Sequence, residues 1–278
     1  MHKVAFITSW NTKRCDTRYM FPHFYDFMVK YTKDGKGKWN NIIIEKEISK
    51  ADFVVILYGV RNCHLNYLDN VSPNRQIYLR REVISDSEIN PDAAFIGDYK
   101  NSFHCCTWHL GLNYQDLISL KRPKKNHALS TVMTAKAHTQ VYFNRLKLAM
   151  RLQKADIDYT FYGKDIKPLP PDQKEEGLLD FRYSYCAENN SVRNYFTEKF
   201  IDPLLCWAKP IYWGCPNIME YFPIASYNVV NIFNMGMVAK ISRLIEEDID
   251  YDAISEARKL ILNKYNIFAV VEEIINGL

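Results

Sequence analysis

Several common sequence patterns are missing from this chain of 278 residues. No apolar run approaches the roughly 20 residues that a membrane-spanning helix needs. The motifs G-x-x-x-x-G-K-(S/T) and G-x-G-x-x-G are absent, so the nucleotide-binding classes that depend on them lose their support. The opening MHKVAFITSW has an apolar run too short for a signal peptide, and we expect a first β-strand there. These absences lead us to expect a cytoplasmic protein with no membrane span.

Metal-binding patterns are also lacking. The seven cysteines form no C-x-x-C pair, and their odd number favours reduced thiols. Two D-x-D triplets occur, but the one at 156–158 precedes a predicted strand and the one at 248–250 lies between predicted helices. His104 and His109, with the cysteines at 105–106, fit no common zinc ligand set. We therefore expect no metal and no other cofactor.

The net charge of +4 is small and is spread along the chain. It fits a protein that handles phosphate groups, but it does not favour a nucleic-acid groove. The one dense basic run, KRPKK at 121–125, is interpreted as a solvated linker. The 19 tyrosines and 15 phenylalanines are a stock that sugar-binding clefts use, although protein cores use aromatic residues more often.

The first half of the chain alternates short apolar runs with an amphipathic segment. We predict strands at 4–8, 41–44, 53–58 and 76–79, a helix at 18–31, and a mixture of strand and loop at 96–110. Continuous apolar strands between helical segments are typical of a parallel sheet that is covered on both faces.

A second alternating series follows the KRPKK segment. We predict strands at 128–133, 159–162, 181–187, 210–213 and 228–232, helices at 140–153 and 197–207, and two or three closing helices. The sequence therefore predicts an α/β protein with two Rossmann-like domains, 1–122 and 123–278, facing each other across a cleft. Ligands of such sheets bind at the carboxyl ends of the strands.

Polar side chains gather in the stretch from Ser184 to Pro216. The predicted strand at 181–187 ends in a carboxylate and two amides, ENN at 188–190. The next predicted helix opens with Thr, Glu and Lys at 197–199. A core would not use so many polar groups, so we expect a binding site where these loops converge.

The motif AENNSVRNYFTEKF, followed by KPIYWGCP, resembles the family 10 fucosyltransferases. The resemblance is dense over 181–223 and continues more thinly in DIDYTFYGKD and QIYLRREVIS. It implies a GT-B enzyme that moves fucose from GDP-fucose to a hydroxyl group of a glycan or saccharide acceptor, with inversion and without a metal. The nucleotide sugar would be a substrate.

Lys199 is the candidate for the diphosphate. A lysine in the first turn of a helix opposes the helix dipole, and a bound diphosphate would reverse the sign of that effect. A leaving nucleoside diphosphate accumulates negative charge, which a metal-free site can stabilise with a cation and with N–H groups at a helix start.

The resemblance assigns further donor-binding residues. Glu198 would bind the nucleotide ribose or sugar hydroxyls, and Tyr195 would lie near the donor. Glu188 and Asn189 would bind donor hydroxyls, and Thr197 belongs to the same motif. Each has an ordinary structural alternative, namely an acid at a helix start, core packing, or capping of a loop.

Glu82 is the candidate general base, since it follows a predicted strand of the first domain, across the cleft from the donor motif. Its alternative is a solvated glutamate beside Arg80 and Arg81.

One departure from the family weakens the assignment of GDP-fucose. The alignment places Gln140 where the family has an arginine of the diphosphate site. Arg145 lies five residues further on and is not on the same helical face by simple spacing, whereas Arg193 could supply the charge. Another nucleotide sugar, for instance a UDP-pentose such as UDP-xylose, remains an alternative donor. A non-catalytic carbohydrate- or nucleotide-binding module is an alternative of a different class.

Overall fold

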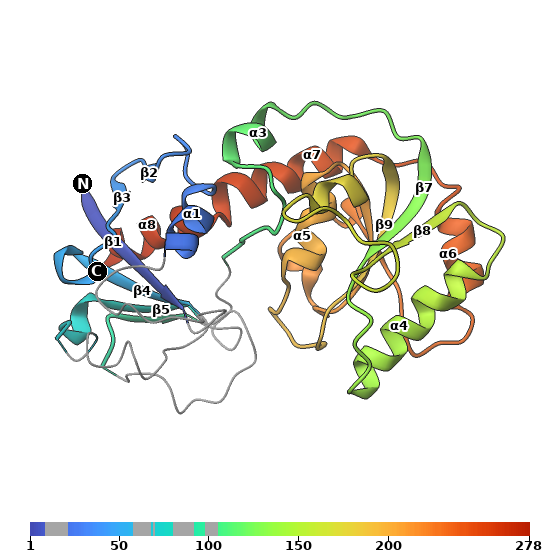
Figure 1. Cartoon of the computed structure of the whole chain (residues 1–278), viewed down its shortest axis with the longest axis horizontal. Coiled ribbons are helices and arrows are strands. Elements are labelled where there is room, and N and C mark those ends of the chain that lie inside the picture. Colours follow the sequence, from blue (N-terminus) through green and yellow to red (C-terminus); the bar gives the residue numbers. More distant parts are fainter. Residues whose placement is uncertain (9–21, 58–67, 69, 80–91, 98–104) are drawn as a thin grey trace. The chain divides into compact units, whose positions relative to one another are not determined.

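The computed structural model describes residues 1–8, 22–57, 68, 70–79, 92–97 and 105–278. The chain divides into two compact units, each with its own sheet (Figure 1). Unit 1 comprises Met1–Cys105, Asn113–Ile118 and Lys264–Leu278, and unit 2 comprises Cys106–Leu112 and Ser119–Asn263. The predicted boundary after residue 122 differs from this division mainly at the C-terminus, because the last helix contributes its apolar face to the core of unit 1.

The sheet of unit 1 has the strand order β2-β3-β1-β4-β5-β6. Its strands are β1 (His2–Thr8), β2 (Lys38–Trp39), β3 (Ile42–Ile44), β4 (Phe53–Leu57), β5 (Gln76–Leu79) and β6 (Phe95–Gly97). Among the strands that the structure describes in this unit, β2 alone is antiparallel to its neighbour, and the other pairs are parallel. The predicted parallel sheet is therefore present. Strand β2 was not predicted, because its two residues are too few to show a hydrophobic period.

Within the described residues, unit 1 contains the helices α1 (Pro22–Val29), α3 (Tyr114–Ser119) and α8 (Ile267–Gly277). Helix α1 lies within the predicted helix at 18–31, whose first residues are outside the described part of the chain. Helix α8 is fixed at its start by Asn266, whose side chain donates a hydrogen bond to the Tyr31 carbonyl at 3.0 Å. Further along, the Phe268 ring packs edge-on against Phe6.

The sheet of unit 2 is parallel throughout, in the order β11-β10-β9-β7-β8. Its strands are β7 (His127–Val132), β8 (Tyr159–Tyr162), β9 (Phe181–Ala187), β10 (Lys209–Trp213) and β11 (Asn228–Val229). Because all five run the same way, their carboxyl ends meet at one edge, where the polar loops of the sequence are brought together.

Helices cover both faces of this sheet. Helices α4 (Gln140–Gln153) and α6 (Met237–Leu244) share a core with the inward residues of β9, such as Tyr183 and Tyr185. On the other face, α5 (Glu198–Leu205) packs on β9 and β10, and α7 (Tyr251–Lys259) packs beside α5. A π-helical turn, Leu260–Lys264, follows α7. Among the described helices, none combines the length and apolar character needed to cross a bilayer.

The predicted solvated linker needs one correction. Lys125, the last residue of KRPKK, directs its ammonium group at three backbone carbonyls. They belong to Leu178, Leu179 and Cys206, at distances of 3.3, 2.7 and 2.7 Å. A run of basic letters does not reveal this, because the carbonyls come from segments more than fifty residues away.

Candidate functional site

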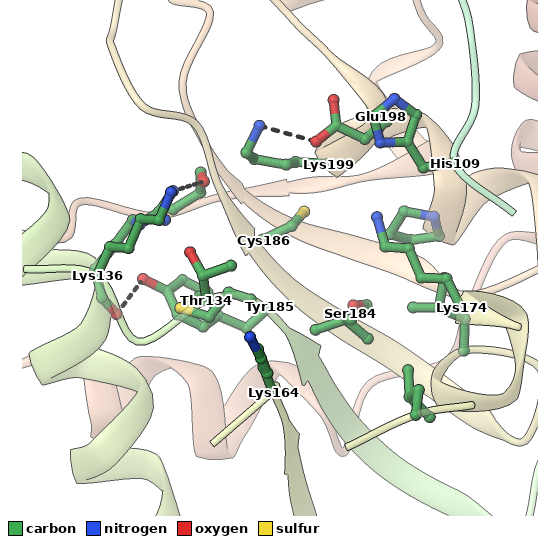
Figure 2. A pocket seen from close by; sticks show the side chains of 18 of the residues that line it. His109, Thr134, Lys136, Lys164, Lys174, Ser184, Tyr185, Cys186, Glu198 and Lys199 are labelled. Atoms are coloured by element: carbon green, nitrogen blue, oxygen red, sulfur yellow. Dashed lines mark hydrogen bonds and ion pairs between the residues drawn. The ribbon is translucent and has the colours of Figure 1, made fainter. Parts of the chain in front are cut away.

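A cavity of about 550 Å³ opens at the carboxyl ends of the unit 2 strands (Figure 2). Its wall combines the ends of β7, β8 and β9 with the loop at 164–173 and with residues of α4 and α5. Basic side chains outnumber carboxylates in its lining: His109, Lys136, Arg145, Lys164, Lys174 and Lys199, against Asp172 and Glu198. This excess of basic side chains favours an anionic ligand.

Glu188 lies directly after β9 and is fully buried. Its carboxylate accepts hydrogen bonds from the backbone N–H of Thr197 at 2.7 Å and from the Thr197 hydroxyl at 2.8 Å. Gly214, after β10, makes room for it, because a Cβ atom at that position would lie 2.5 Å from the Glu188 Cγ. Burial raises the pKa of Glu188, an effect that Lys199 and Thr197 oppose.

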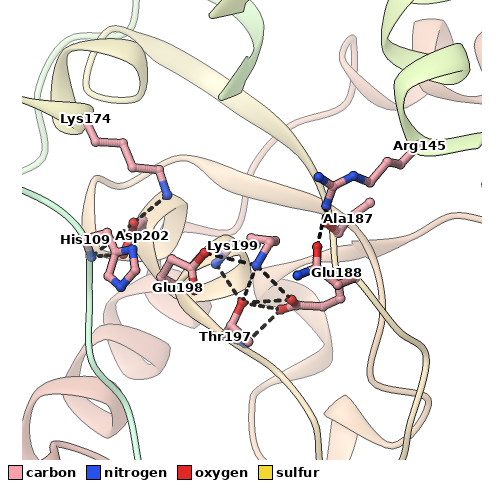
Figure 3. Close-up of polar contacts among 10 residues, drawn as sticks. His109, Arg145, Lys174, Ala187, Glu188, Thr197, Glu198, Lys199 and Asp202 are labelled. Atoms are coloured by element: carbon pink, nitrogen blue, oxygen red, sulfur yellow. Dashed lines mark hydrogen bonds and ion pairs between the residues drawn. The ribbon is translucent and has the colours of Figure 1, made fainter. Parts of the chain in front are cut away.

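Lys199 stands in the first turn of α5, which Thr197 caps. Its ammonium group lies 3.0 Å from the Thr197 hydroxyl, 3.0 Å from the Glu198 carboxylate and 3.4 Å from that of Glu188 (Figure 3). Burial acts against its charge, yet the two carboxylates hold the pKa of Lys199 above its ordinary value. The unfavourable interaction of Lys199 with the helix dipole is thus already offset by two carboxylates of the protein. The sequence did not indicate these partners.

Glu198 keeps one oxygen for a ligand. Oε1 contacts Lys199, whereas Oε2 has no hydrogen-bond partner within the described ranges, and the residue lines the cavity. Burial would raise its pKa, but Lys199, His109 and Lys174 hold the pKa of Glu198 well below its ordinary value. It is therefore a carboxylate at neutral pH and can accept hydrogen bonds from hydroxyl groups.

Arg145 reaches the same edge from α4 and is 3% exposed. Nη1 donates to the Asn189 Oδ1 at 2.7 Å and weakly to the Ala187 carbonyl at 3.4 Å, and the guanidinium carbon lies 4.2 Å from the Tyr142 ring centre. Nε is buried without a hydrogen-bond partner, and no carboxylate of the described chain forms an ion pair with it. Burial lowers the pKa of Arg145. A bound anion would compensate this charge.

Gln140 and Arg145 lie on different faces of α4, as their spacing predicted, but Arg145 is the residue that lines the cavity. Gln140 is the exposed first residue of α4, whereas Arg145 lies on the buried stripe formed with Leu148, Ala149 and Leu152. The inward stripe of α4 points at the sheet, and a long side chain on it reaches the end of β9. The sequence could have indicated this role of Arg145, because it is a charged residue on an otherwise apolar helix face.

Lys174 and Asp202 form a second charged group in the wall. Lys174 begins a short helical turn, Lys174–Gly177, and its ammonium lies 2.7 Å from the fully buried Asp202 carboxylate of α5. The backbone N–H of His109 donates to the same carboxylate at 3.1 Å (Figure 3). Burial acts against its charge, but Asp202 and Glu198 hold the pKa of Lys174 above its ordinary value. The sequence reasoning missed both residues.

The remaining predicted site residues lie apart from the cavity lining, with the exception of Asn189. Thr197 is buried behind Glu188 and Lys199, and Tyr195 is 5% exposed. Arg193 is exposed and pairs with Glu220 at 3.0 Å. Glu82, with Arg80 and Arg81, lies outside the described residues.

Asp158 and Asp250, one from each D-x-D triplet, have structural partners. Asp158 accepts a hydrogen bond from the N–H of Ala128 at 2.9 Å, and Asp250 caps α7 through the N–H groups of Asp252 and Ala253. Both are thus turn or helix-end residues, as predicted. Across the described ranges, no three His, Cys, Asp or Glu side chains are grouped to hold a metal ion.

Comparison with known proteins gives one matching family. Residues 122–259 match the model of glycosyltransferase family 10 (fucosyltransferase), C-terminal part. A fucosyltransferase-like protein of Arabidopsis thaliana is 29% identical over 133 residues, which are 46% of this chain and 25% of that protein. The alpha-(1,3)-fucosyltransferase FucT of Helicobacter pylori is 37% identical over 60 residues, 22% of this chain and 13% of that one. The chain therefore spans a quarter or less of these relatives.

The fold also resembles a solved one. The crystal structure of an alpha1,3-fucosyltransferase superposes with a TM-score of 0.53 at 17% identity, over 99% of this chain and 90% of that chain. Together with the two parallel sheets, this likeness confirms the predicted α/β fold of the GT-B class.

Proposed function

Because the chain belongs to glycosyltransferase family 10, we propose that it transfers fucose from GDP-fucose to a hydroxyl group of a glycan or saccharide acceptor. The family match at 122–259 contains every residue that lines the cavity except His109. The cavity is thus the donor site of this proposal, and the acceptor is bound elsewhere.

One observation carries the proposal: Arg145 is buried at the carboxyl end of β9 without a carboxylate partner, in the same cavity as Lys199. A diphosphate bound there would receive hydrogen bonds from the guanidinium and from N–H groups at the start of α5. Arg145 removes the objection that Gln140 raised against a GDP-sugar. The proposed diphosphate site does not need Arg193, because Arg193 forms an ion pair with Glu220 at the surface.

The other donor contacts follow from the groups that remain available. Glu198 would accept hydrogen bonds from ribose hydroxyls through Oε2. The side-chain NH2 group of Asn189 would donate a hydrogen bond to the nucleotide sugar. Glu188 is too deeply buried to touch the donor in this arrangement, so we assign it to positioning Thr197 and Lys199. Tyr195 stays a predicted neighbour of the donor.

The proposed reaction is a single inverting displacement without a metal. The acceptor oxygen forms a bond to the anomeric carbon of fucose while the bond to the GDP oxygen breaks. Glu82 takes the acceptor proton, and the leaving diphosphate keeps the electron pair, stabilised by Arg145 and Lys199. An inverting displacement requires a base on the face of the sugar opposite the leaving group. We therefore propose a residue from the first half of the chain, Glu82, and not one from the donor motif.

The test is a panel of nucleotides and nucleotide sugars. Binding is measured by calorimetry for GDP, GDP-fucose, UDP and UDP-xylose, and sugar release is then measured with and without excess EDTA. The proposal expects GDP-fucose to bind and to be turned over equally in EDTA. Preference for UDP-xylose would favour the alternative donor, and binding without any turnover would favour a binding module. Loss of turnover in EDTA that manganese restores would refute metal independence.

A further inference from the structure

Lys174 differs from Lys199, the other half-buried lysine of the donor cavity, in the use of its three N–H donors. Lys199 has protein partners for all three, two of them carboxylates. Lys174 has a single partner within the described chain, Asp202, so two of its donors are unused. Its side chain is 21% exposed, and the residue lines the cavity.

The position of this ammonium group is fixed by its surroundings. Asp202 is fully buried and is itself held by the N–H of His109. The turn that carries Lys174 is fastened at Glu175, whose carboxylate accepts a hydrogen bond from the N–H of Gly111 at 2.8 Å. It is also packed at Gly177, where a Cβ atom would come within 2.9 Å of Val132. A lysine held in one place loses little conformational freedom when a ligand binds.

The charges around the cavity explain why a further cation is useful. Among the described residues, Glu188, Glu198 and Asp202 pair with Lys199 and Lys174, whereas the guanidinium of Arg145 has no carboxylate partner. The carboxylates thus offset part of the positive charge of the cavity, so a diphosphate gains most from N–H donors that have no protein partner. Arg145 supplies such donors at one end of the group in Figure 3, and Lys174 supplies them at the other, with Lys199 between.

We propose that Lys174 is a donor-binding residue that hydrogen-bonds phosphate or ribose oxygens of the nucleoside monophosphate half of the donor. It lies on the side of Glu198, the residue that the proposed function assigns to the ribose, and opposite Arg145. The inference rests on the proposed function, since it takes the cavity to be a nucleotide-sugar site. Asp202 acts as the positioning residue that directs the ammonium at the ligand.

The experiment separates binding from structure by removing the ion pair as a whole. K174M alone would leave the buried Asp202 charge without a partner and would lower stability for that reason. In the variant K174M/D202N the asparagine keeps an acceptor for the N–H of His109, and no buried charge is left. The matched control is K167M, because Lys167 contacts the Tyr162 ring and does not line the cavity.

GDP and GMP affinities are measured by calorimetry, and melting temperatures are measured for the same samples. We expect the double variant to melt close to the wild type while both nucleotides bind about tenfold or more weakly, the worth of a charged hydrogen bond. The control K167M should bind normally. Normal nucleotide affinity in the double variant overturns the inference and leaves the ion pair purely structural.

If the double variant does not fold, K174Q takes its place, since glutamine still donates a hydrogen bond to Asp202; normal affinity in folded K174Q would also overturn the inference. If the wild-type protein binds no guanine nucleotide at all, the proposed function fails, and the inference that depends on it falls with it.

Discussion

The guanidinium of Arg145 allows charge to be separated from packing at a single residue. Changing it to methionine keeps an apolar stem of similar length on the buried stripe of α4 but removes a buried cation whose Nε lacks a partner. We expect R145M to be as stable as the wild type or more stable, because a poorly compensated buried charge opposes folding. Transfer from GDP-fucose should fall about 100-fold or more, as when an electrostatic donor is lost.

Melting temperature and kcat/KM of R145M test this prediction together. A half-buried arginine of the same helix, Arg151, provides the control, since it donates to the Met235 carbonyl and does not line the cavity. A clear loss of stability with unchanged transfer would show that Arg145 serves the fold and not the donor.

A second prediction at the scale of single residues concerns Lys125 and the pH dependence of stability. Burial lowers its pKa to about 8 in the folded protein, from an ordinary value of 10.5. Between these values the unfolded chain binds more protons than the folded one, so this residue makes the free energy of unfolding rise with pH from about 8 to 10.5. Below about pH 8 its unfavourable contribution is constant.

The measurement compares the pH dependence of unfolding in the wild type and in K125M, because Lys174 and Lys199 have raised pKa values and act in the opposite direction. K125M should be less stable at every pH, since three carbonyls lose their donor, but the difference should widen above pH 8. K124M, which removes an exposed neighbour, should follow the wild type. A difference that does not vary with pH would show that Lys125 titrates normally.

At the scale of elements, the close approach of two strand ends shapes the site. Gly214 follows β10, and a methyl group there would lie 2.3 Å from the Tyr212 hydroxyl and 2.5 Å from the Glu188 Cγ. We expect G214A to displace Glu188, with a loss of about 1–3 kcal/mol of stability from overpacking. Because Glu188 holds Thr197 and Lys199, GDP affinity should fall as well.

G277A is the matched control for this change, because nothing lies within 4 Å of a Cβ atom at that position. Unfolding in urea and calorimetry with GDP would follow the two properties separately. Normal GDP affinity in G214A would mean that the start of α5 does not depend on Glu188.

The elements themselves were largely predictable. The helix at 140–153 and the strands at 159–162 and 181–187 have their predicted bounds, because their apolar periodicity is local and their ends carry polar residues. The partners of the charged residues were not predictable. Lys199 was expected to be uncompensated, and Lys174 was overlooked, because each is paired through a fold that brings distant segments together.

At the scale of the whole molecule, the proposed function assigns donor binding and the general base to different units, which can be tested. Every residue that lines the cavity belongs to unit 2, whereas Glu82, the proposed base, belongs to unit 1. Donor binding and sugar transfer should therefore respond differently to damage in unit 1. Its last helix, α8, is the place to apply such damage, because Lys264–Leu278 returns to unit 1 after the chain has completed unit 2.

We expect a chain that ends at Asn263 to lose sugar transfer but to keep GDP binding. Helix α8 buries six large apolar side chains: Ile267, Phe268, Val270, Val271, Ile274 and Ile275. Each contributes about 1.5–3 kcal/mol when fully buried, so their combined loss is comparable to the whole stability of a typical domain, and unit 1 should unfold. Unit 2 keeps both of its helical layers and the whole cavity. Hydrogen exchange would show which unit has opened, and calorimetry with GDP would report on the cavity. Loss of GDP binding with unit 2 still protected from exchange would show that unit 1 also holds the nucleotide.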